Sequence, residues 1–211
     1  MKKGKGFTLV EMLVVISILS VVGVLILTIF TNTLKGSNKS QIIGVIKQNG
    51  QSVLEQIDKT VRGADKVVCT SKALVTSVFH DTLVIVKNGV YTRYRFIVFT
   101  SSTNGLIQQD NPTKQIVRGT GKEETDSVFK TSVCDTGSLM PRTPGEQVTI
   151  LSDTNPQTGV SVENYSFARD ELDGFNDQVR IKFDLKPGVL VPQSIRDQID
   201  IVTFQTTIQL R

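Results

Sequence analysis

The sequence is poor in the residue types that carry most enzyme chemistry. Its 211 residues include no tryptophan, two cysteines and a single histidine, His80. His80 has no serine or cysteine nucleophile motif beside it, and one histidine with two cysteines outside a CxxC spacing does not make a zinc site. The sequence also lacks the P-loop, the dinucleotide fingerprint and the HExxH motif. We therefore expect a protein without enzymatic activity.

The net charge is small and unevenly distributed along the chain. The formal net charge is +4, and three of the positive charges are lysines within the first five residues. Without this leader the chain is close to neutral, and no dense run of lysine and arginine with interleaved aromatic residues occurs elsewhere. The sequence therefore gives no reason to expect nucleic acid as a partner.

A long apolar stretch follows the basic leader. Between Phe7 and Phe30 the only ionisable side chain is Glu11. At about 1.5 Å per residue, a helix over this range is longer than the roughly 30 Å hydrocarbon core of a bilayer. The run is also longer than the apolar region of a secretory signal, and no small-x-small cleavage site follows it closely. The lysines before it predict a cytoplasmic N-terminus, which places the rest of the chain outside.

Glu11 has two interpretations. A carboxylate in an apolar segment costs about 2.5 to 3.5 kcal/mol at the bilayer centre, and less near an edge. In the first interpretation, Glu11 is an acid of the first helical turn that the helix N-terminus stabilises and that reaches the interface. In the second, cleavage after Gly6 frees the amine of Phe7, and Glu11 of a neighbouring copy neutralises it. The second interpretation makes the segment an assembly element.

A resemblance to a known family lies in the sequence KGFTLVE at residues 5–11, which opens the apolar run. It resembles the class III signal of the type IV filament superfamily, which contains type IV pilins and the pseudopilins of type II secretion. The resemblance implies that a prepilin peptidase cuts after Gly6 and methylates the new N-terminus at Phe7. It also implies that Glu11 takes part in subunit docking and methylation. The resemblance covers roughly the first 30 residues.

The same resemblance implies partners and a location. The partners are the prepilin peptidase, other pilin or pseudopilin subunits, the inner-membrane assembly platform and the lipid bilayer. The protein is then a single-pass protein of the cell's inner membrane, and after assembly it is part of a periplasmic or extracellular filament. The long exported domain with a Gln/Thr-rich final strand is similar to J-type pseudopilins or W-type minor pilins, which are tip components, although a major pilin is an alternative.

Two alternatives come from other functional classes. The first is a signal-anchored binding module, such as an adhesin or a DNA-capture receptor, that never polymerises. The second is a secreted enzyme with an incidental anchor, which requires a nucleophile or metal cluster that the sequence does not contain. The first alternative predicts that substitutions of Gly6 or Glu11 have no effect.

The resemblance and the hydrophobic periodicity together divide the chain into four parts. We expect a prepilin leader at 1–6, a transmembrane and assembly helix at 7–30, an amphipathic continuation of that helix at 31–64 and an exported β-rich domain at 65–211. The polar stretch 31–40 is either a break or the point where the helix leaves the lipid. The fold class is α+β, with a long N-terminal helix packed on a predominantly antiparallel β-sheet domain, as in pilins. The apolar stripe expected at helical spacing is Ile42, Ile43, Ile46, Val53, Leu54, Ile57 and Val61.

After residue 65 the apolar period changes to the two-residue period of strands. Asn88-Gly89 predicts a type I′ hairpin turn, and a slip in alternation between Val162 and Tyr165 predicts a β-bulge. Residues 101–145 are rich in loop-forming residues, so we expect long loops there, with one or two short strands at 115–117 and 128–129. The other strands expected are 66–69, 74–79, 83–86, 91–99, 147–151, 160–167, 178–185 and 202–210.

Two further features concern cysteines and acidic residues. Cys69 and Cys134 both fall in the exported part, where an oxidising compartment favours one disulfide; two buried free thiols are the alternative. An acidic segment between two strands contains Asp170, Asp173 and Asp177 around a glycine turn. Such oxygen ligands suit Ca²⁺, and some pseudopilins bind calcium in this region, but the same composition is typical of a solvated turn. No other cofactor is expected.

Overall fold

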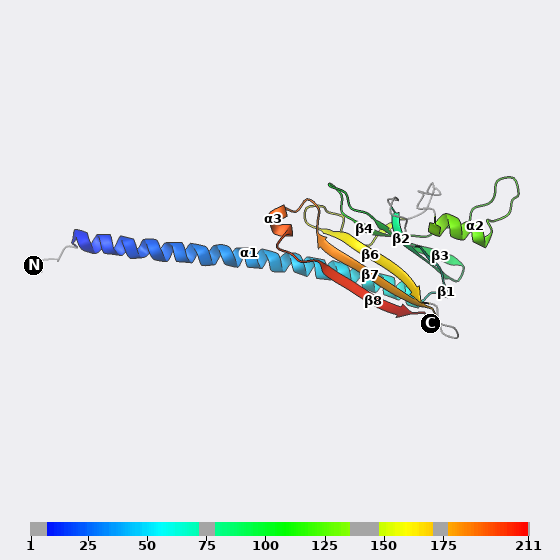
Figure 1. Cartoon of the computed structure of the whole chain (residues 1–211), viewed down its shortest axis with the longest axis horizontal. Coiled ribbons are helices and arrows are strands. Elements are labelled where there is room, and N and C mark those ends of the chain that lie inside the picture. Colours follow the sequence, from blue (N-terminus) through cyan, green and yellow to red (C-terminus); the bar gives the residue numbers. More distant parts are fainter. Residues whose placement is uncertain (1–7, 72–78, 136–147, 171–176, 211) are drawn as a thin grey trace, which may run out of the picture. The chain divides into compact units, whose positions relative to one another are not determined.

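Residues 8–71, 79–135, 148–170 and 177–210 are described by the structure, a computed structural model of the chain (Figure 1). The chain divides into two compact units, Met1–Ile42 and Ile43–Arg211. The first unit contains the N-terminal part of helix α1, and the second contains the rest of α1 and all the strands.

Helix α1 runs without interruption over Leu9–Arg62, 54 residues. The polar stretch 31–40 is therefore not a break in the helix. Proline is absent from this range, and the glycine within the stretch, Gly36, lies in open space. The helix ends at Arg62, two residues before the expected boundary at 64, and the amide of Ala64 closes the last turn by donating to the carbonyl of Val61 at 3.1 Å.

The second unit contains two sheets in which every described strand pair is antiparallel. This confirms the predicted α+β class. The strands of the five-stranded sheet, in spatial order, are β1 (Lys66–Ser71), β2 (Phe79–Lys87), β3 (Val90–Ile97), β4 (Leu106–Asp110) and β5 (Thr149–Ile150). Those of the three-stranded sheet are β6 (Val160–Asp170), β7 (Gln178–Pro187) and β8 (Val202–Gln209). The short helical elements are α2 (Asp126–Lys130), the π-helix η1 (Thr131–Asp135) and α3 (Gln193–Arg196).

The core of the second unit joins helix α1 to both sheets. The helix buries four apolar residues at helical spacing, Ile46, Val53, Ile57 and Val61, which confirms the amphipathic pattern. Between the sheets, the ring of Phe96 on β3 stacks on Phe167 of β6 with ring centroids 5.0 Å apart. The same ring stacks on Tyr165 at 4.2 Å. Aromatic rings therefore connect the two sheets through β3 and β6.

One glycine of α1 is required by packing. Gly50 is buried, and a Cβ added there would overlap the end of the Phe204 ring on β8. Phe204 in turn stacks on Phe183 of β7, with centroids 5.4 Å apart. The helix backbone and the three-stranded sheet approach each other closely at this point because position 50 has no side chain.

The two turn and bulge predictions are confirmed. Asn88 and Gly89 have φ angles of 49° and 78°, as a type I′ turn requires, and they connect β2 to β3. The register of β6 against β7 shifts between Glu163 and Tyr165, and the intervening Asn164 has a φ of 43°. The strands predicted at 178–185 and 202–210 are β7 and β8.

The prediction of long loops between 101 and 145 is wrong in two places. Residues 106–110 form β4, which pairs along its length with β3. The apolar pair Val128 and Phe129 lies in helix α2 and not in a strand. Only Phe129 is buried, while Val128 is 52% exposed, so the pair does not form an apolar face of a strand. At 115–117 there is a single bridge, between Ile116 and Glu123. The strand predicted at 74–79 lies almost entirely outside the described residues.

Candidate functional site

The first unit presents a long apolar surface. From Leu9 to Phe30 nearly every side chain is exposed, with values such as 80% for Leu9 and 66% for Ile29. By length and composition, α1 contains a stretch able to cross a membrane. A continuous apolar surface of this extent is larger than soluble monomers usually leave in contact with water, and it is suited to contact with lipid or with other apolar helices.

The hydroxyl groups within this surface are satisfied inside the helix. Ser17, Ser20 and Thr28 each donate to the carbonyl oxygen four residues earlier, at 2.8, 2.8 and 2.9 Å. An unpaired polar group in hydrocarbon costs several kcal/mol, whereas a hydroxyl bonded to its own helix does not leave a donor unmet. These side chains are therefore compatible with an apolar environment.

Glu11 caps the start of α1 together with Thr8. One carboxylate oxygen, Oε2, accepts hydrogen bonds from the Thr8 amide at 2.9 Å and from the Thr8 hydroxyl at 3.0 Å. The Thr8 hydroxyl accepts from the Glu11 amide at 3.3 Å. This reciprocal arrangement is a capping box, whose sequence pattern is Ser or Thr followed three residues later by Glu or Gln. We did not predict the role of Thr8, although the pattern TLVE at residues 8–11 contains it.

The other carboxylate oxygen of Glu11 is not used by the cap. Oε1 accepts no hydrogen bond from any described residue, and the side chain is exposed. Glu11 can therefore cap its own helix with one oxygen and accept a donor from another molecule with the other. The predicted cleavage site at Gly6 and the methylated residue Phe7 lie outside the described residues and stay predictions.

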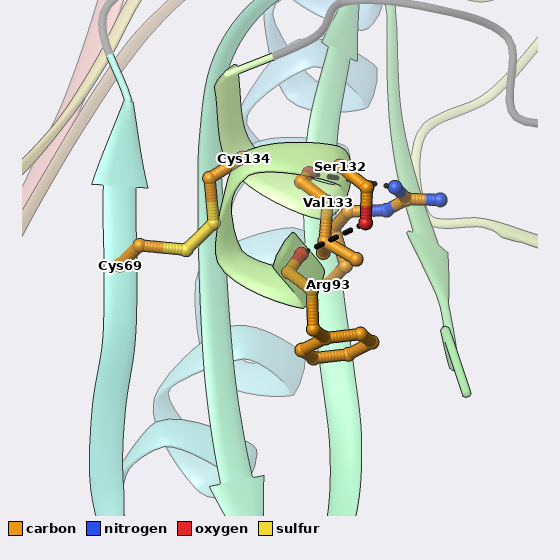
Figure 2. The surroundings of a disulfide bond; sticks show 6 residues. Cys69, Arg93, Ser132, Val133 and Cys134 are labelled. Atoms are coloured by element: carbon orange, nitrogen blue, oxygen red, sulfur yellow. Dashed lines mark hydrogen bonds between the residues drawn. A yellow bond between two sulfur atoms is a disulfide. The ribbon is translucent and has the colours of Figure 1, made fainter. Parts of the chain in front are cut away.

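In the second unit, a disulfide joins Cys69 of β1 to Cys134 of η1 (Figure 2). Their Cα atoms are 6.5 Å apart. Next to it, Nη1 of Arg93 on β3 donates to the carbonyl of Val133 at 3.5 Å. The segment that contains α2 and η1 is therefore attached to two strands of the sheet, to β1 by the disulfide and to β3 by the hydrogen bond. The buried residues around the disulfide are Val68, Val84, Val86, Phe129, Val133 and Cys134.

Arg93 also belongs to a buried ion cluster that the sequence did not suggest. Its Nε and Nη2 bind the two carboxylate oxygens of Asp110 at 2.8 and 2.6 Å. Nη2 of Arg95 binds the same carboxylate at 2.5 Å. Asp110 is only 1% exposed. The cluster connects β3 to β4 through side chains.

Two carboxylates of the acidic segment are described by the structure, and each pairs with an arginine of a flanking strand, β6 or β7. Asp170 pairs with Arg180 at 2.6 Å, and Asp177 pairs with Arg169 at 2.9 Å. Asp173 lies outside the described residues. Among the described residues, no group of three or more metal-binding side chains occurs. A calcium ion at these aspartates stays a prediction, and it would compete with both arginines for the carboxylates.

The comparisons with known proteins concern the N-terminal segment. Residues 1–27 match the family model of the prokaryotic N-terminal methylation motif. Neither the curated proteins nor the solved structures contain a significant match to the chain. The matched range includes the basic leader, the Thr8–Glu11 cap and most of the exposed apolar surface. The N-terminal segment of this chain is therefore the prepilin signal of type IV pilins and pseudopilins.

Proposed function

We propose that this pilin-like protein is a structural subunit of a type IV pilus or a type II secretion pseudopilus. In this proposal prepilin peptidase cuts after Gly6, and the subunit then assembles through residues 7–30. The observation that carries the proposal is the coincidence of the methylation motif at 1–27 with the exposed apolar stretch 9–30 of α1, in which Glu11 is the single acid. A structural subunit needs no catalytic group, which agrees with the composition of the chain.

The mechanism of assembly follows from the properties of apolar helices. Such helices are equally stable in lipid and in a protein bundle, so close packing and polar contacts decide how they associate. A carboxylate in this setting is expensive unless a cation pairs with it. Oε1 of Glu11 accepts a hydrogen bond from the freed, positively charged amine of Phe7 in a neighbouring subunit. This ion pair sets the axial register of the two helices.

The second unit is the exported domain in this proposal. The lysines at positions 2, 3 and 5 favour retention of the leader on the cytoplasmic side. A disulfide between Cys69 and Cys134 suits an oxidising compartment outside the cytoplasm. Both features support a membrane-anchored subunit whose β-rich domain, residues 65–211, is exported.

The finer proposal is a minor, tip-type subunit. The exported domain carries a long excursion between β4 and β5, and its last strand, β8, is uncharged and rich in threonine and glutamine. A long excursion and an uncharged final strand suit a component that occurs in few copies and binds different neighbours. Quantification of isolated filaments tests this point, because a tip component is present at a few copies per filament and a major pilin at many.

Mass spectrometry of the mature N-terminus tests the proposed function. We expect the protein purified after expression of the whole sequence to begin at Phe7 and to carry one N-methyl group. Gly6→Val blocks this processing, whereas Gly4→Val, in the same leader, leaves it unchanged. A mature protein that retains Met1, or one that begins beyond Phe30, contradicts the proposal and favours an uncleaved anchor or a secreted protein.

A further inference from the structure

Strand β8 forms an open edge of the three-stranded sheet. It pairs with β7 over its whole length, from Val202 opposite Leu185 to Gln209 opposite Gln178. No described strand pairs with its other side. Figure 1 shows β8, in red, at the margin of this sheet. An open edge presents a row of backbone donors and acceptors to which another strand can bind.

The register identifies the residues whose backbone groups point outward. The amide of Leu210, one residue past β8, donates to the carbonyl of Asp177, one residue before β7, at 3.0 Å. Hydrogen-bonded pairs alternate along an antiparallel ladder, so the even-numbered residues of β8 bond to β7. The amides and carbonyls of the odd-numbered residues therefore point away from the sheet. These residues are Thr203, Gln205, Thr207 and Gln209, and their side chains are exposed.

Other outer strands of the two sheets carry features that hinder strand addition, and β8 does not. The register of β1 shifts after Val67. β5 is two residues long. β6 contains the bulge at Asn164, and its Val162 amide is bonded to the carbonyl of Gly105. β8 has eight residues in regular register, with no charge, no proline and no bulge. Proteins commonly protect long edges with such features, so an unprotected edge is suited to pairing.

Charge next to the edge indicates the chemistry of the partner. On the outer face of the sheet, Lys182 of β7 lies opposite Gln205 and is exposed. Lys182 forms no ion pair in the described part of the chain, whereas its neighbour Arg180 pairs with Asp170. A strand added to β8 lies about 10 Å from β7, two strand spacings, which a lysine and a glutamate side chain together can span. A second copy of β8 has no acidic residue to offer Lys182.

We propose that β8 binds an extended strand of a different protein chain by backbone pairing. The segment is rich in β-forming residues and carries an acidic side chain on its outer face, opposite Gln205 and within reach of Lys182. Backbone hydrogen bonds supply affinity and the acidic residue supplies specificity, as in other cases of strand addition. This inference does not depend on polymerisation through residues 7–30.

Peptide binding to the full-length protein in lipid nanodiscs tests the proposal. The probes are fluorescent nine-residue peptides that alternate valine with threonine and carry one glutamate or, in the matched peptide, one lysine on the threonine face. We expect the glutamate peptide to bind more tightly than the lysine peptide by fluorescence anisotropy. Lys182→Glu reverses this preference without changing the backbone edge. An unchanged preference, or no binding of either peptide at millimolar concentration, overturns the proposal.

Proline substitution tests the backbone pairing separately. Gln205→Pro removes an outward donor and leaves the bonds to β7 in place, so we expect about tenfold weaker binding, which corresponds to roughly one hydrogen bond. Gln205→Val is the matched control and keeps the affinity. If hydrogen exchange of β7 shows that Gln205→Pro does not fold, Thr207→Pro takes its place. Unchanged peptide binding by a folded proline variant overturns the proposal. Self-association of the wild-type chain that is lost in the proline variant also overturns it, because the partner strand is then a second copy.

Discussion

Replacement of Gly50 by alanine perturbs the contact between helix α1 and the three-stranded sheet. A Cβ at this position overlaps Cζ, Cε1 and Cε2 of Phe204. Phe204 is 9% exposed, and its ring stacks on Phe183. The ring therefore cannot move aside without disturbing a second aromatic residue in the core. Gly44, six residues earlier in the same helix, has no atom within 4 Å of an added Cβ and provides a matched control.

The expected magnitudes follow from two opposing effects. Alanine is favoured over glycine in a helix interior by about 1 kcal/mol. Overpacking a well-filled core costs about 1 to 3 kcal/mol. Gly50→Ala should therefore lower the free energy of unfolding of the second unit by about 0 to 2 kcal/mol, whereas Gly44→Ala should raise it by about 1 kcal/mol. The free energies of unfolding of the two variants should therefore differ by about 1 to 3 kcal/mol, with Gly44→Ala the more stable.

Hydrogen exchange followed by mass spectrometry suits this measurement, because the full chain is kept in detergent and the β7 and β8 amides report the opening of the sheet. Phe204→Leu replaces the ring that the new Cβ meets by a shorter side chain. In the double variant with Gly50→Ala it should therefore recover part of the lost stability. We expect a coupling energy of about 0.5 to 3 kcal/mol between the two positions. If Gly50→Ala stabilises the sheet as Gly44→Ala does, the close approach between α1 and β8 is not as described here.

Three further predictions concern the second unit. Asp110→Ala removes the buried carboxylate that Arg93 and Arg95 share and should cost about 3 to 5 kcal/mol in urea unfolding; Asp58→Ala, in an exposed pair with Arg62, should cost less than about 1 kcal/mol. Burial raises the pKa of Tyr94 to about 12 from 10.0, against an opposing effect of the Thr60 hydroxyl. The stability that this shift contributes is present below pH 10 and is lost as the pH rises through 12, so Tyr94→Phe should flatten the alkaline part of the stability profile and remove a loss of about 3 kcal/mol; an unchanged slope between pH 10 and 12 would show that another group titrates there. Replacing both Cys69 and Cys134 by serine reopens a loop with a sequence separation of 65, which should cost about 4 kcal/mol and increase hydrogen exchange in α2 and η1 more than in β7; equal effects on both would contradict a local role.

Features with a strong local signal could be predicted from the sequence. Helix α1 follows from the uncharged run after the leader and from the apolar period beyond Ile42, and its end follows from the glycine at position 63. The β2–β3 turn follows from Asn88-Gly89, because few residue pairs other than this one adopt two successive positive φ angles. β7 and β8 follow from strict alternation. In each case neighbouring residues alone determine the conformation.

Features that depend on distant partners could not be predicted. β4 has the sequence LIQQD, in which Gln108 and Asp110 are polar but buried. Asp110 is buried because Arg93 and Arg95, on the adjacent strand, neutralise it, and nothing in the local sequence indicates this pairing. Helix α2 was missed for a similar reason, since Phe129 is held among strands that are remote in sequence.

The capping box at the start of α1 is a different kind of omission. Its pattern, Thr8 followed by Glu11, is local and was available in the sequence. The two interpretations of Glu11 do not exclude each other, because the cap uses one carboxylate oxygen and leaves the other without a hydrogen bond from any described residue.

The substitution Glu11→Gln separates these two roles and tests the central claim most directly. Glutamine can replace glutamate in a capping box but carries no charge. Thr8→Ala, by contrast, removes the cap and keeps the charge. The measurement is the fraction of mature, Phe7-initiated protein that is recovered in sheared filaments. We predict that Glu11→Gln abolishes incorporation while Thr8→Ala largely preserves it. Incorporation of Glu11→Gln at the wild-type level would contradict the charge pairing on which the proposed assembly depends.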